Sequence, residues 1–98
     1  MVIWSEPAKD DLRSIHDFIA NDSKYYAKKV VQDIREKVGV LERLPRMGKK
    51  VAELVDEDNI RELALYSYRI IYEIKTDELV EVLAVIHKRQ DFTAEDLP

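Results

Sequence analysis

The chain has 98 residues, a formal net charge of −4 at pH 7 and no cysteine. This length leaves room for a single domain, residues 1–98, with one core, and the lack of cysteine excludes disulfides and thiolate-bound metals. The first residues lack the pattern of a signal peptide, and no segment has the ~20 apolar residues that cross a bilayer. We therefore expect a cytoplasmic protein without membrane contact. No metal-ligand or phosphate-loop spacing is present, so neither a metal nor a cofactor is expected.

The N-terminal half is patterned as one short strand followed by two amphipathic helices. Val2–Trp4 is an apolar run of strand type, and Ser5 behind it is a suitable helix N-cap. Apolar residues then recur at helical spacing over residues 8–19 and again over 27–41. Because only Asn21-Asp22-Ser23 separates the two patterns, we predict an antiparallel helical hairpin.

The C-terminal half changes to a strand pattern. Three segments, Ile60–Leu65, Tyr68–Lys75 and Leu79–His87, are rich in β-branched and aromatic residues, and the turns at 66–67 and 76–78 are short. Short turns require antiparallel neighbours, because a parallel return needs a crossover of about a dozen residues. The order β-α-α-β-β-β predicts a two-layer α+β domain, with the helical hairpin packed on one face of a mainly antiparallel sheet.

The two glycines suggest local constraints. Gly39 lies inside the second predicted helix, where glycine lowers stability by about 0.5–1 kcal/mol relative to alanine, so it hints at close packing there. Gly48 would allow a tight turn that directs Lys49 and Lys50. These two lysines could instead belong to an ordinary solvated loop.

The helices can cover only one face of the predicted sheet, and basic residues are predicted on the other. The residues assigned to the helix-covered side alternate along two strands: Ile70, Tyr72, Ile74, Val80, Val82, Ala84 and Ile86. This pattern turns Arg69 to the free face. With a three-residue turn at 76–78, Arg69 pairs with Val85 and lies diagonal to His87, about 7–8 Å away. Arg69, His87 and Arg89 would then form one cluster able to hold a phosphate.

These residues also have structural interpretations. Arg69 could bind the carboxylate of Glu62 or Glu73 rather than a ligand, and His87 could be an ordinary strand-end histidine.

The face on which Arg61 lies is open at this point. A tight turn at residues 66–67 would place it on the core side, opposite to Arg69, whereas a bulge near Leu65 would reverse that placement.

A resemblance to a known family extends over nearly the whole chain. The motifs that carry it are Trp4-Ser5-x-x-Ala8-x-x-Asp11-Leu12-x-x-Ile15, Leu44-Pro45-x-x-Gly48-Lys49, Arg61-Glu62-Leu63, Tyr68-Arg69-Ile70-Ile71-Tyr72-Glu73 and Val85-Ile86-His87-Lys88-Arg89. In this order and spacing they resemble the RelE/ParE superfamily, the toxins of type II toxin–antitoxin systems. The resemblance implies a growth-arresting protein that is neutralised by a cognate antitoxin and assembles with it into an oligomer.

The superfamily has two functional branches. RelE-like members are metal-independent endoribonucleases that cut mRNA on the ribosome, whereas ParE-like members block DNA gyrase. By position, Arg69 matches the phosphate-holding arginine of the RelE branch and Arg89 the cation after the last strand, with His87 as a candidate acid or base. The C-terminal tyrosine of RelE-like enzymes is absent. The Gly48-Lys49 loop and the His87-Lys88-Arg89 ending are more typical of the ParE branch.

We therefore predict a ParE-like toxin that acts on gyrase. Its candidate target- or phosphate-binding residues are Lys49, Lys50, Arg61 and Lys88. Two alternatives remain: a RelE-like nuclease that uses Arg69, Arg89 and His87, and an inactive module that only binds the antitoxin.

Overall fold

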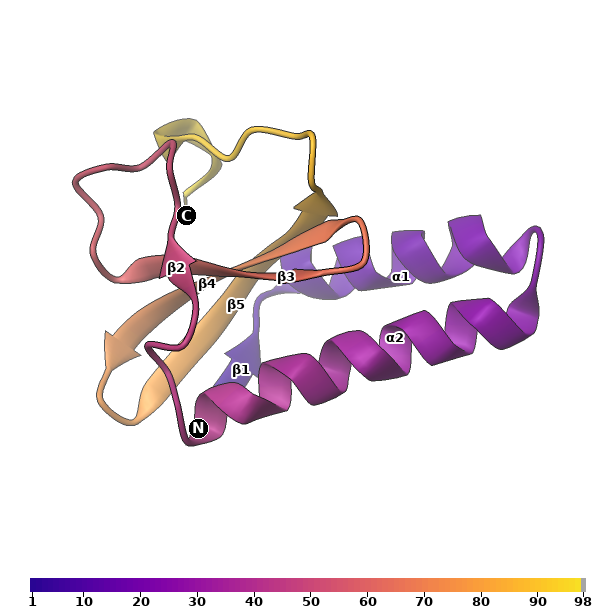
Figure 1. Ribbon diagram of the computed structural model, residues 1–98, viewed down its shortest axis with the longest axis horizontal. Coiled ribbons are helices and arrows are strands. Elements are labelled where there is room, and N and C mark those ends of the chain that lie inside the picture. The colour runs from indigo at the N-terminus through magenta and orange to yellow at the C-terminus, as the bar shows by residue number, and fades with distance from the viewer. Residues whose placement is uncertain (98) are drawn as a thin grey trace.

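Two helices and a five-stranded sheet form two layers in the computed structural model, which describes residues 1–97 (Figure 1). The elements in chain order are β1 (Val2–Trp4), α1 (Glu6–Ala20), α2 (Lys24–Gly39), the 3-10 turn η1 (Val40–Glu42), β2 (Lys49–Lys50), β3 (Ile60–Leu65), β4 (Tyr68–Thr76), β5 (Leu79–His87) and the 3-10 turn η2 (Ala94–Asp96). The predicted α+β class and element order are confirmed. The short strand β2 is an addition that no periodic pattern in the sequence indicated.

The strands follow the order β1-β5-β4-β3-β2 across the sheet. β1 lies parallel to β5, and the other neighbours are antiparallel, so the sheet is mainly antiparallel as predicted. The turn between β4 and β5 is one residue shorter than predicted, because Thr76 pairs with Leu79 and is therefore part of the strand. The register shifts by one residue between Ile74 and Thr76, so the pairing farther along the strands, Ile74 with Val80, is the one that a three-residue turn would give.

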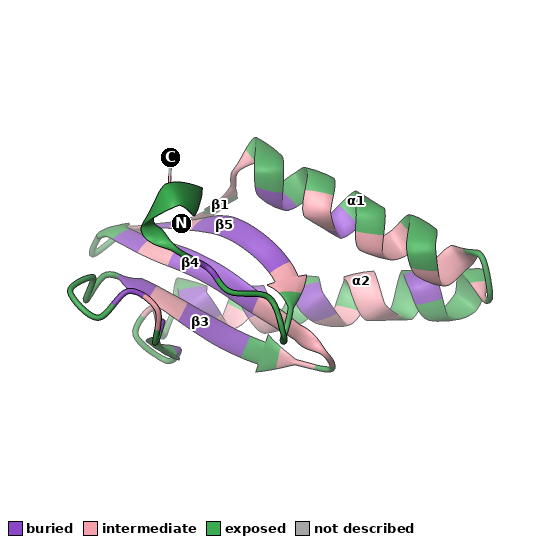
Figure 2. Cartoon of the chain, turned by 90° about the horizontal axis from the view of Figure 1, so that it is seen from above, coloured by how far each residue is buried: buried purple, intermediate pink, exposed green. Residues whose placement is uncertain are grey.

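Both helices begin at serine N-caps, which satisfy backbone N–H groups that the first helical turn leaves free. The hydroxyl of Ser5 accepts from the N–H of Ala8 at 3.1 Å, and that of Ser23 accepts from the N–H of Tyr26 at 3.2 Å. Figure 2 shows buried residues along β3, β4 and β5, while the outer faces of α1 and α2 are exposed. The main core contains Ala8, Leu12, Ile34, Val38, Leu41, Leu63, Ile70, Tyr72, Ile74, Val80, Val82 and Val85.

The sheet face away from the helices is partly covered, so the prediction of a bare face is wrong. A second apolar cluster joins the sheet to the loop after β2 and to the C-terminal segment. Its buried members are Val51, Leu54, Ile60, Ile71, Leu83, Ala84 and Phe92. The helices cover one face as predicted, but Phe92, only 3% exposed, closes over part of the other. Segments without a hydrophobic period supply this cover, which is why the sequence pattern did not reveal it.

A β-bulge in β5 changes which side chains share a face. Ile71 pairs with Ala84 and Tyr72 pairs with Val82, so Leu83 is an extra residue in β5. One extra residue reverses the alternation beyond it. Val85 therefore enters the main core, whereas Ala84 and Ile86 lie with the second cluster. The assignment of Ala84 and Ile86 to the helix-covered side is wrong for this reason.

The carboxylate of Asp11 on α1 accepts the N–H of Val85 at 2.9 Å, just beyond the bulge. Burial raises the pKa of Asp11, while this hydrogen bond opposes the rise. The aspartate of the first family motif thus links α1 to β5 where the ladder is irregular.

The glycines play different roles from those expected. A Cβ at Gly39 would meet no atom within 4 Å, so the predicted close packing there is wrong. A Cβ at Gly48 would lie 2.5 Å from the backbone oxygen of Glu62 and 2.7 Å from the Tyr72 hydroxyl. That hydroxyl accepts the Gly48 N–H at 3.0 Å and donates to the carbonyl of Pro45 at 2.7 Å. Neither glycine has a positive φ, so the backbone angles at residue 48 do not require glycine. Gly48 is needed because a side chain would not fit in this close approach.

Candidate functional site

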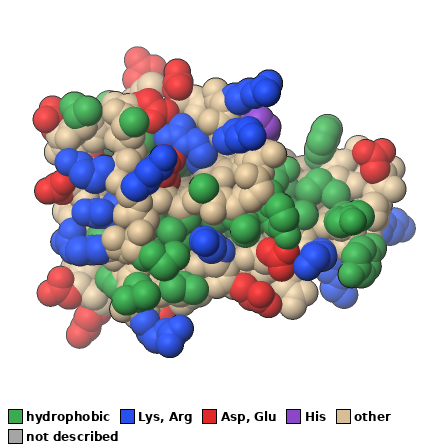
Figure 3. All heavy atoms as spheres, viewed as in Figure 1, with side chains coloured by type: hydrophobic (Ala, Val, Ile, Leu, Met, Phe, Trp, Pro, Cys, Tyr) green, Lys and Arg blue, Asp and Glu red, His purple; other side chains and the backbone are tan. Residues whose placement is uncertain are grey.

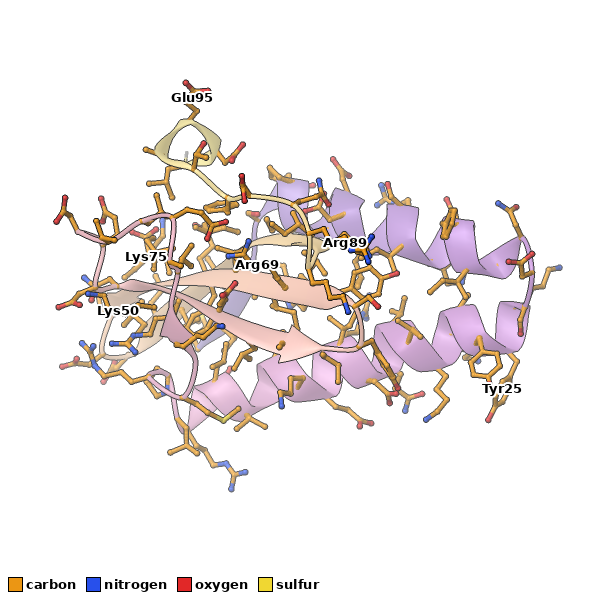
Figure 4. All side chains as sticks on the ribbon, turned by 45° about the horizontal axis from the view of Figure 1, so that its top comes forward. Tyr25, Lys50, Arg69, Lys75, Arg89 and Glu95 are labelled. Atoms are coloured by element: carbon orange, nitrogen blue, oxygen red, sulfur yellow. The ribbon has the colours of Figure 1, made fainter. Side chains whose placement is uncertain are left out.

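Arg69 lies at the centre of an ion-pair network on the sheet face away from the helices (Figure 4). Its Nη1 and Nη2 atoms donate to the Glu53 carboxylate at 2.8 and 2.9 Å, and its Nε donates to Glu62. Nη1 also donates to the backbone oxygen of Gln90 at 2.7 Å. These four hydrogen bonds use four of the five guanidinium N–H groups. Arg69 thus binds the carboxylate of Glu62, one of the two partners that the sequence suggested. Glu53 is a further partner that was not predicted.

The charged groups of this network shift one another's pKa. The hydrogen bonds from Arg69 are the largest cause that lowers the pKa of Glu53 from 4.5 to about 2, and the N–H of Phe92 acts in the same direction. The bond to Glu53 is likewise the largest cause that raises the pKa of Arg69. With 12% of the Arg69 side chain and 21% of the Glu53 side chain exposed, solvent screens the pair only partly. Both groups are charged at neutral pH, and the positive charge is balanced within the protein.

His87 does not join Arg69, so the predicted cluster of Arg69, His87 and Arg89 is wrong in geometry. Because of the bulge, Arg69 pairs with Ile86 instead of Val85, and His87 pairs with Tyr68. The Tyr68 and His87 rings meet edge to face with centroids 6.5 Å apart. The Nδ1 atom of His87 accepts the N–H of Arg89 at 3.2 Å. Arg89 itself is exposed in the turn after β5, whereas Arg69 lies over the sheet (Figure 4).

Arg61 lies on the core side of β3, as the tight-turn alternative requires. Leu65 pairs with Tyr68, and the turn residue Tyr66 has a φ of 55°. Arg61 is paired with Tyr72 and donates from Nη1 to the carbonyl of Gly48 at 3.0 Å. Its Nε is buried and has no hydrogen-bond partner within the part of the chain that the structure describes. Arg61 is thus held near the Gly48 loop on the side opposite to Arg69.

The predicted lysines differ in how far they are engaged. Lys50 binds Asp58 at 2.9 Å, an ion pair that lowers the pKa of Asp58. Lys49 is 3.7 Å from Glu62 with 78% of its side chain exposed, and Lys88 is also exposed. Figure 3 shows basic side chains on the face that carries β2, with acidic ones among them. The net charge of −4 therefore hides a local group of cations.

A shallow depression of about 600 Å³ lies around Arg69. Its lining includes Lys49, Glu53, Glu62, Tyr66, Arg69 and Lys88. The Tyr66 hydroxyl is not a free acid or base, because it donates to Asp33 of α2 and this bond raises its pKa. The depression therefore combines two buried or half-buried carboxylates with lysines at its rim.

A larger groove, about 800 Å³, lies on another side of the molecule, next to β1 at the edge of the sheet. Its apolar lining consists of Val2, Ile3, Trp4, Leu12 and Val31. Its basic lining consists of Lys9, Arg13, His16 and Arg35, and no acidic residue among residues 1–97 lines it. No pattern in the sequence groups these residues, because the pairing of β1 with β5 and the packing of α1 on α2 bring them together only in the fold.

Glu53 is the most important residue of the site that the sequence did not indicate. It lies in an irregular loop with no periodic pattern, among several other acidic residues, so no local signal distinguishes it. Within residues 1–97, no group of three His, Cys, Asp or Glu side chains is placed to hold a metal ion. No helix in the same residues is long and apolar enough to span a membrane.

The topology, with a helical hairpin on a sheet that ends in three antiparallel strands, defines the class of RelE/ParE-like toxin folds. A family model described as "ParE toxin of type II toxin-antitoxin system, parDE" matches residues 2–92, so the chain belongs to the ParE toxin family. A solved structure titled "Chromosomal ParDE TA system from P. aeruginosa" is similar in fold, with a TM-score of 0.71 and 24% identity over 88% of this chain and 92% of that one. No curated protein sequence matches the chain.

Proposed function

We propose that this ParE-family toxin arrests growth by blocking DNA gyrase in the cytoplasm and cuts no RNA. The family supplies the class of activity, a toxin of a type II toxin–antitoxin system. The observation that supports a non-nucleolytic mechanism is the state of Arg69, whose guanidinium is held by the carboxylates of Glu53 and Glu62.

Metal-independent cleavage of RNA requires a base, an acid and a cation at the scissile phosphate. Arg69 has one N–H left for a phosphate, and the two carboxylates beside it would repel that phosphate. His87, the candidate acid or base, pairs with Tyr68 and so lies on the opposite face of the sheet. The three groups that a RelE-like mechanism would need are therefore not assembled around one point.

The cations that remain exposed are the best candidates for contacting the target. Lys88 and Arg89 are exposed, and Lys49, with 78% of its side chain exposed, is 3.7 Å from Glu62. Lys50 is also exposed but lies closer to its partner, 2.9 Å from Asp58, and Arg61 binds the Gly48 carbonyl. Exposed cations steer association with an acidic or phosphate-bearing partner. We therefore assign target contact first to Lys49, Lys88 and Arg89, and only second to Lys50 and Arg61.

The test uses the purified chain in two assays, gyrase supercoiling of plasmid DNA and translation of a reporter mRNA. We expect inhibited supercoiling with trapped DNA breaks and an intact message. Cuts in ribosome-bound message without any effect on gyrase would overturn the proposal in favour of a RelE-like nuclease. No effect in either assay, with antitoxin binding retained, would identify an inactive module. Lys88→Glu should weaken gyrase inhibition, and Lys24→Glu on α2 is the matched control at an exposed site far from this surface.

We further propose that the antitoxin binds in the groove beside β1 through an acidic amphipathic segment. The groove offers an apolar floor that includes Trp4 and basic side chains that include Arg13 and Arg35. Apolar anchors supply most of the affinity of a segment that folds on binding, and opposite charges orient it. Ile3 of the edge strand is 36% exposed, so the apolar floor is open to such a segment.

Charge reversal separates this interface from the toxic surface. The double variant Arg13→Glu, Arg35→Glu should still arrest growth but escape neutralisation by the cognate antitoxin. Arg43→Glu, an exposed arginine outside the groove, should remain neutralised. If the double variant binds the antitoxin as tightly as the unmodified chain, the antitoxin uses another surface.

A further inference from the structure

The network around Arg69 joins three segments that are distant in the sequence. Glu53 belongs to the loop after β2, Arg69 to β4, and Gln90 and Phe92 to the segment that follows β5. The same Glu53 oxygen, Oε2, accepts from Arg69 at 2.8 Å and from the N–H of Phe92 at 2.9 Å. Arg69 also holds the carbonyl of Gln90 at 2.7 Å. One ion pair thus fixes the backbone of the C-terminal segment at two points.

The other contacts that attach this segment to the sheet are local hydrogen bonds at its start and one buried side chain. Residues 88–93 contain no strand or helix, so no ladder of backbone hydrogen bonds holds them. The Lys88 N–H donates to the Ser67 carbonyl at 2.7 Å, and the Phe92 side chain is buried in the second apolar cluster. Near its start the segment is also tied to the end of β5. The N–H groups of Arg89 and Gln90 donate to His87 Nδ1 at 3.2 Å and to the His87 carbonyl at 2.9 Å, and the His87 N–H donates to the Gln90 side chain at 2.8 Å. From outside β5, the bidentate Arg69–Glu53 pair is the main polar restraint on Gln90 and Phe92, and such a pair restrains orientation as well as distance.

We propose that Arg69 is a positioning residue: with Glu53 it clamps the segment Gln90–Phe92 onto the sheet and thereby fixes Lys88 and Arg89 for contact with the target. The last part of this inference rests on the proposed function. The clamp assigns to the arginine of the Tyr68–Tyr72 motif a role that needs no contact with a phosphate.

The clamp and direct phosphate binding predict opposite effects of removing Glu53. If Arg69 acted directly on a phosphate, loss of Glu53 would free its guanidinium and raise activity. If Arg69 and Glu53 act together as a clamp, loss of either partner releases the same segment. The single variants that remove Glu53 or Arg69 should then lose similar amounts of activity, and the double variant should lose no more, because the effects of residues that act as one unit are not additive.

The first measurement is amide hydrogen exchange followed by NMR. In Glu53→Ala, the Gln90 amide, which donates to the His87 carbonyl and not to Glu53, should exchange about tenfold faster or more relative to the core amide of Ile71, because local release does not require global unfolding. The control Glu81→Ala removes the 3.1 Å ion pair with Lys75, in which no residue of the C-terminal segment takes part. It should leave the ratio of the two exchange rates unchanged. An unchanged ratio in Glu53→Ala would overturn the clamp.

The second measurement is gyrase supercoiling with the same proteins. Glu53→Ala, Arg69→Ala and the double variant should lose inhibition to a similar degree, about tenfold. Stronger inhibition by Glu53→Ala would overturn the positioning role and restore Arg69 as a direct ligand. If Arg69→Ala fails to fold, Glu53→Ala decides alone, because Glu53 lies in a loop. If the unmodified chain has no effect on gyrase, the proposed function fails, and the exchange ratio still decides the clamp.

Discussion

Replacing Gly48 with alanine tests how closely the loop before β2 approaches the core. The added Cβ would lie 2.5 Å from the Glu62 backbone oxygen, 2.7 Å from the Tyr72 hydroxyl and 2.9 Å from the Tyr72 ring. Favourable contacts between carbon atoms lie near 3.5–4.0 Å, so some group must move by about 1 Å. Tyr72 is fully buried, and the Glu62 oxygen belongs to the backbone of β3, so neither yields easily.

The expected loss of stability has two parts. Overpacking costs about 1–3 kcal/mol, and displacing the Tyr72 hydroxyl from the Gly48 N–H removes a hydrogen bond of about 1 kcal/mol. A total of about 2–4 kcal/mol in a domain of this size lowers Tm by roughly 10–25 °C.

The assay is thermal unfolding by circular dichroism, with Gly39→Ala as the control. Gly39 is exposed in α2 with helical backbone angles, and its Cβ would meet nothing within 4 Å. Alanine there should raise stability by about 0.5–1 kcal/mol, a Tm gain of a few degrees. Replacing glycine with alanine should thus lower the stability at residue 48 and raise it at residue 39. A Gly48→Ala protein as stable as the unmodified chain would show that the loop moves away freely and would refute this reasoning.

Three further predictions concern single side chains. Tyr72→Phe leaves the buried Gly48 N–H and the partly buried Pro45 carbonyl without their hydrogen-bond partner, so urea unfolding should show a loss of about 1–3 kcal/mol; an unchanged midpoint would contradict the assigned hydrogen bonds. The pKa of Glu53 in the folded protein is about 2, below its ordinary value of 4.5. The Glu53 carboxylate therefore contributes fully to the free energy of unfolding above about pH 5, and this contribution is lost as the pH falls toward 2. The stability gap between the unmodified chain and Glu53→Gln should therefore be about 1–3 kcal/mol at pH 7, allowing for partial solvent screening, and close near pH 2; a gap independent of pH would rule out ion pairing as its cause. Ser5→Ala should cost about 1 kcal/mol by removing the α1 N-cap, whereas Ser14→Ala in the exposed middle of α1 should cost nothing; equal Tm shifts would argue against the cap.

Local patterns in the sequence predicted the elements well. The helical spacing, the N-cap at Ser5 and the short turns predicted the order of two helices and four of the five strands and, to within about three residues, their bounds. Alternation along β4 also placed Arg69 correctly on the face away from the helices. These features depend on neighbouring residues and on the period of one element, so they can be read without the fold.

The candidate site was predicted only in part. Arg69 and its partner Glu62 lie on regular strands, and their pairing was among the expected alternatives. The extra residue Leu83 was not foreseen, and it moved His87 to the other face. A one-residue bulge leaves no mark in a strand whose residues are apolar on both faces, because the alternation that would reveal it is missing.

The sequence by itself determined the class of fold, the family and the side of the sheet on which Arg69 lies. Only the tertiary structure decided what Arg69 does there. Its partners Glu53 and Gln90 come from segments without a repeating pattern, and they meet Arg69 because the loop after β2 and the C-terminal segment both fold onto one sheet face. Contacts between distant irregular segments depend on where the chain returns in space, which no local periodicity encodes.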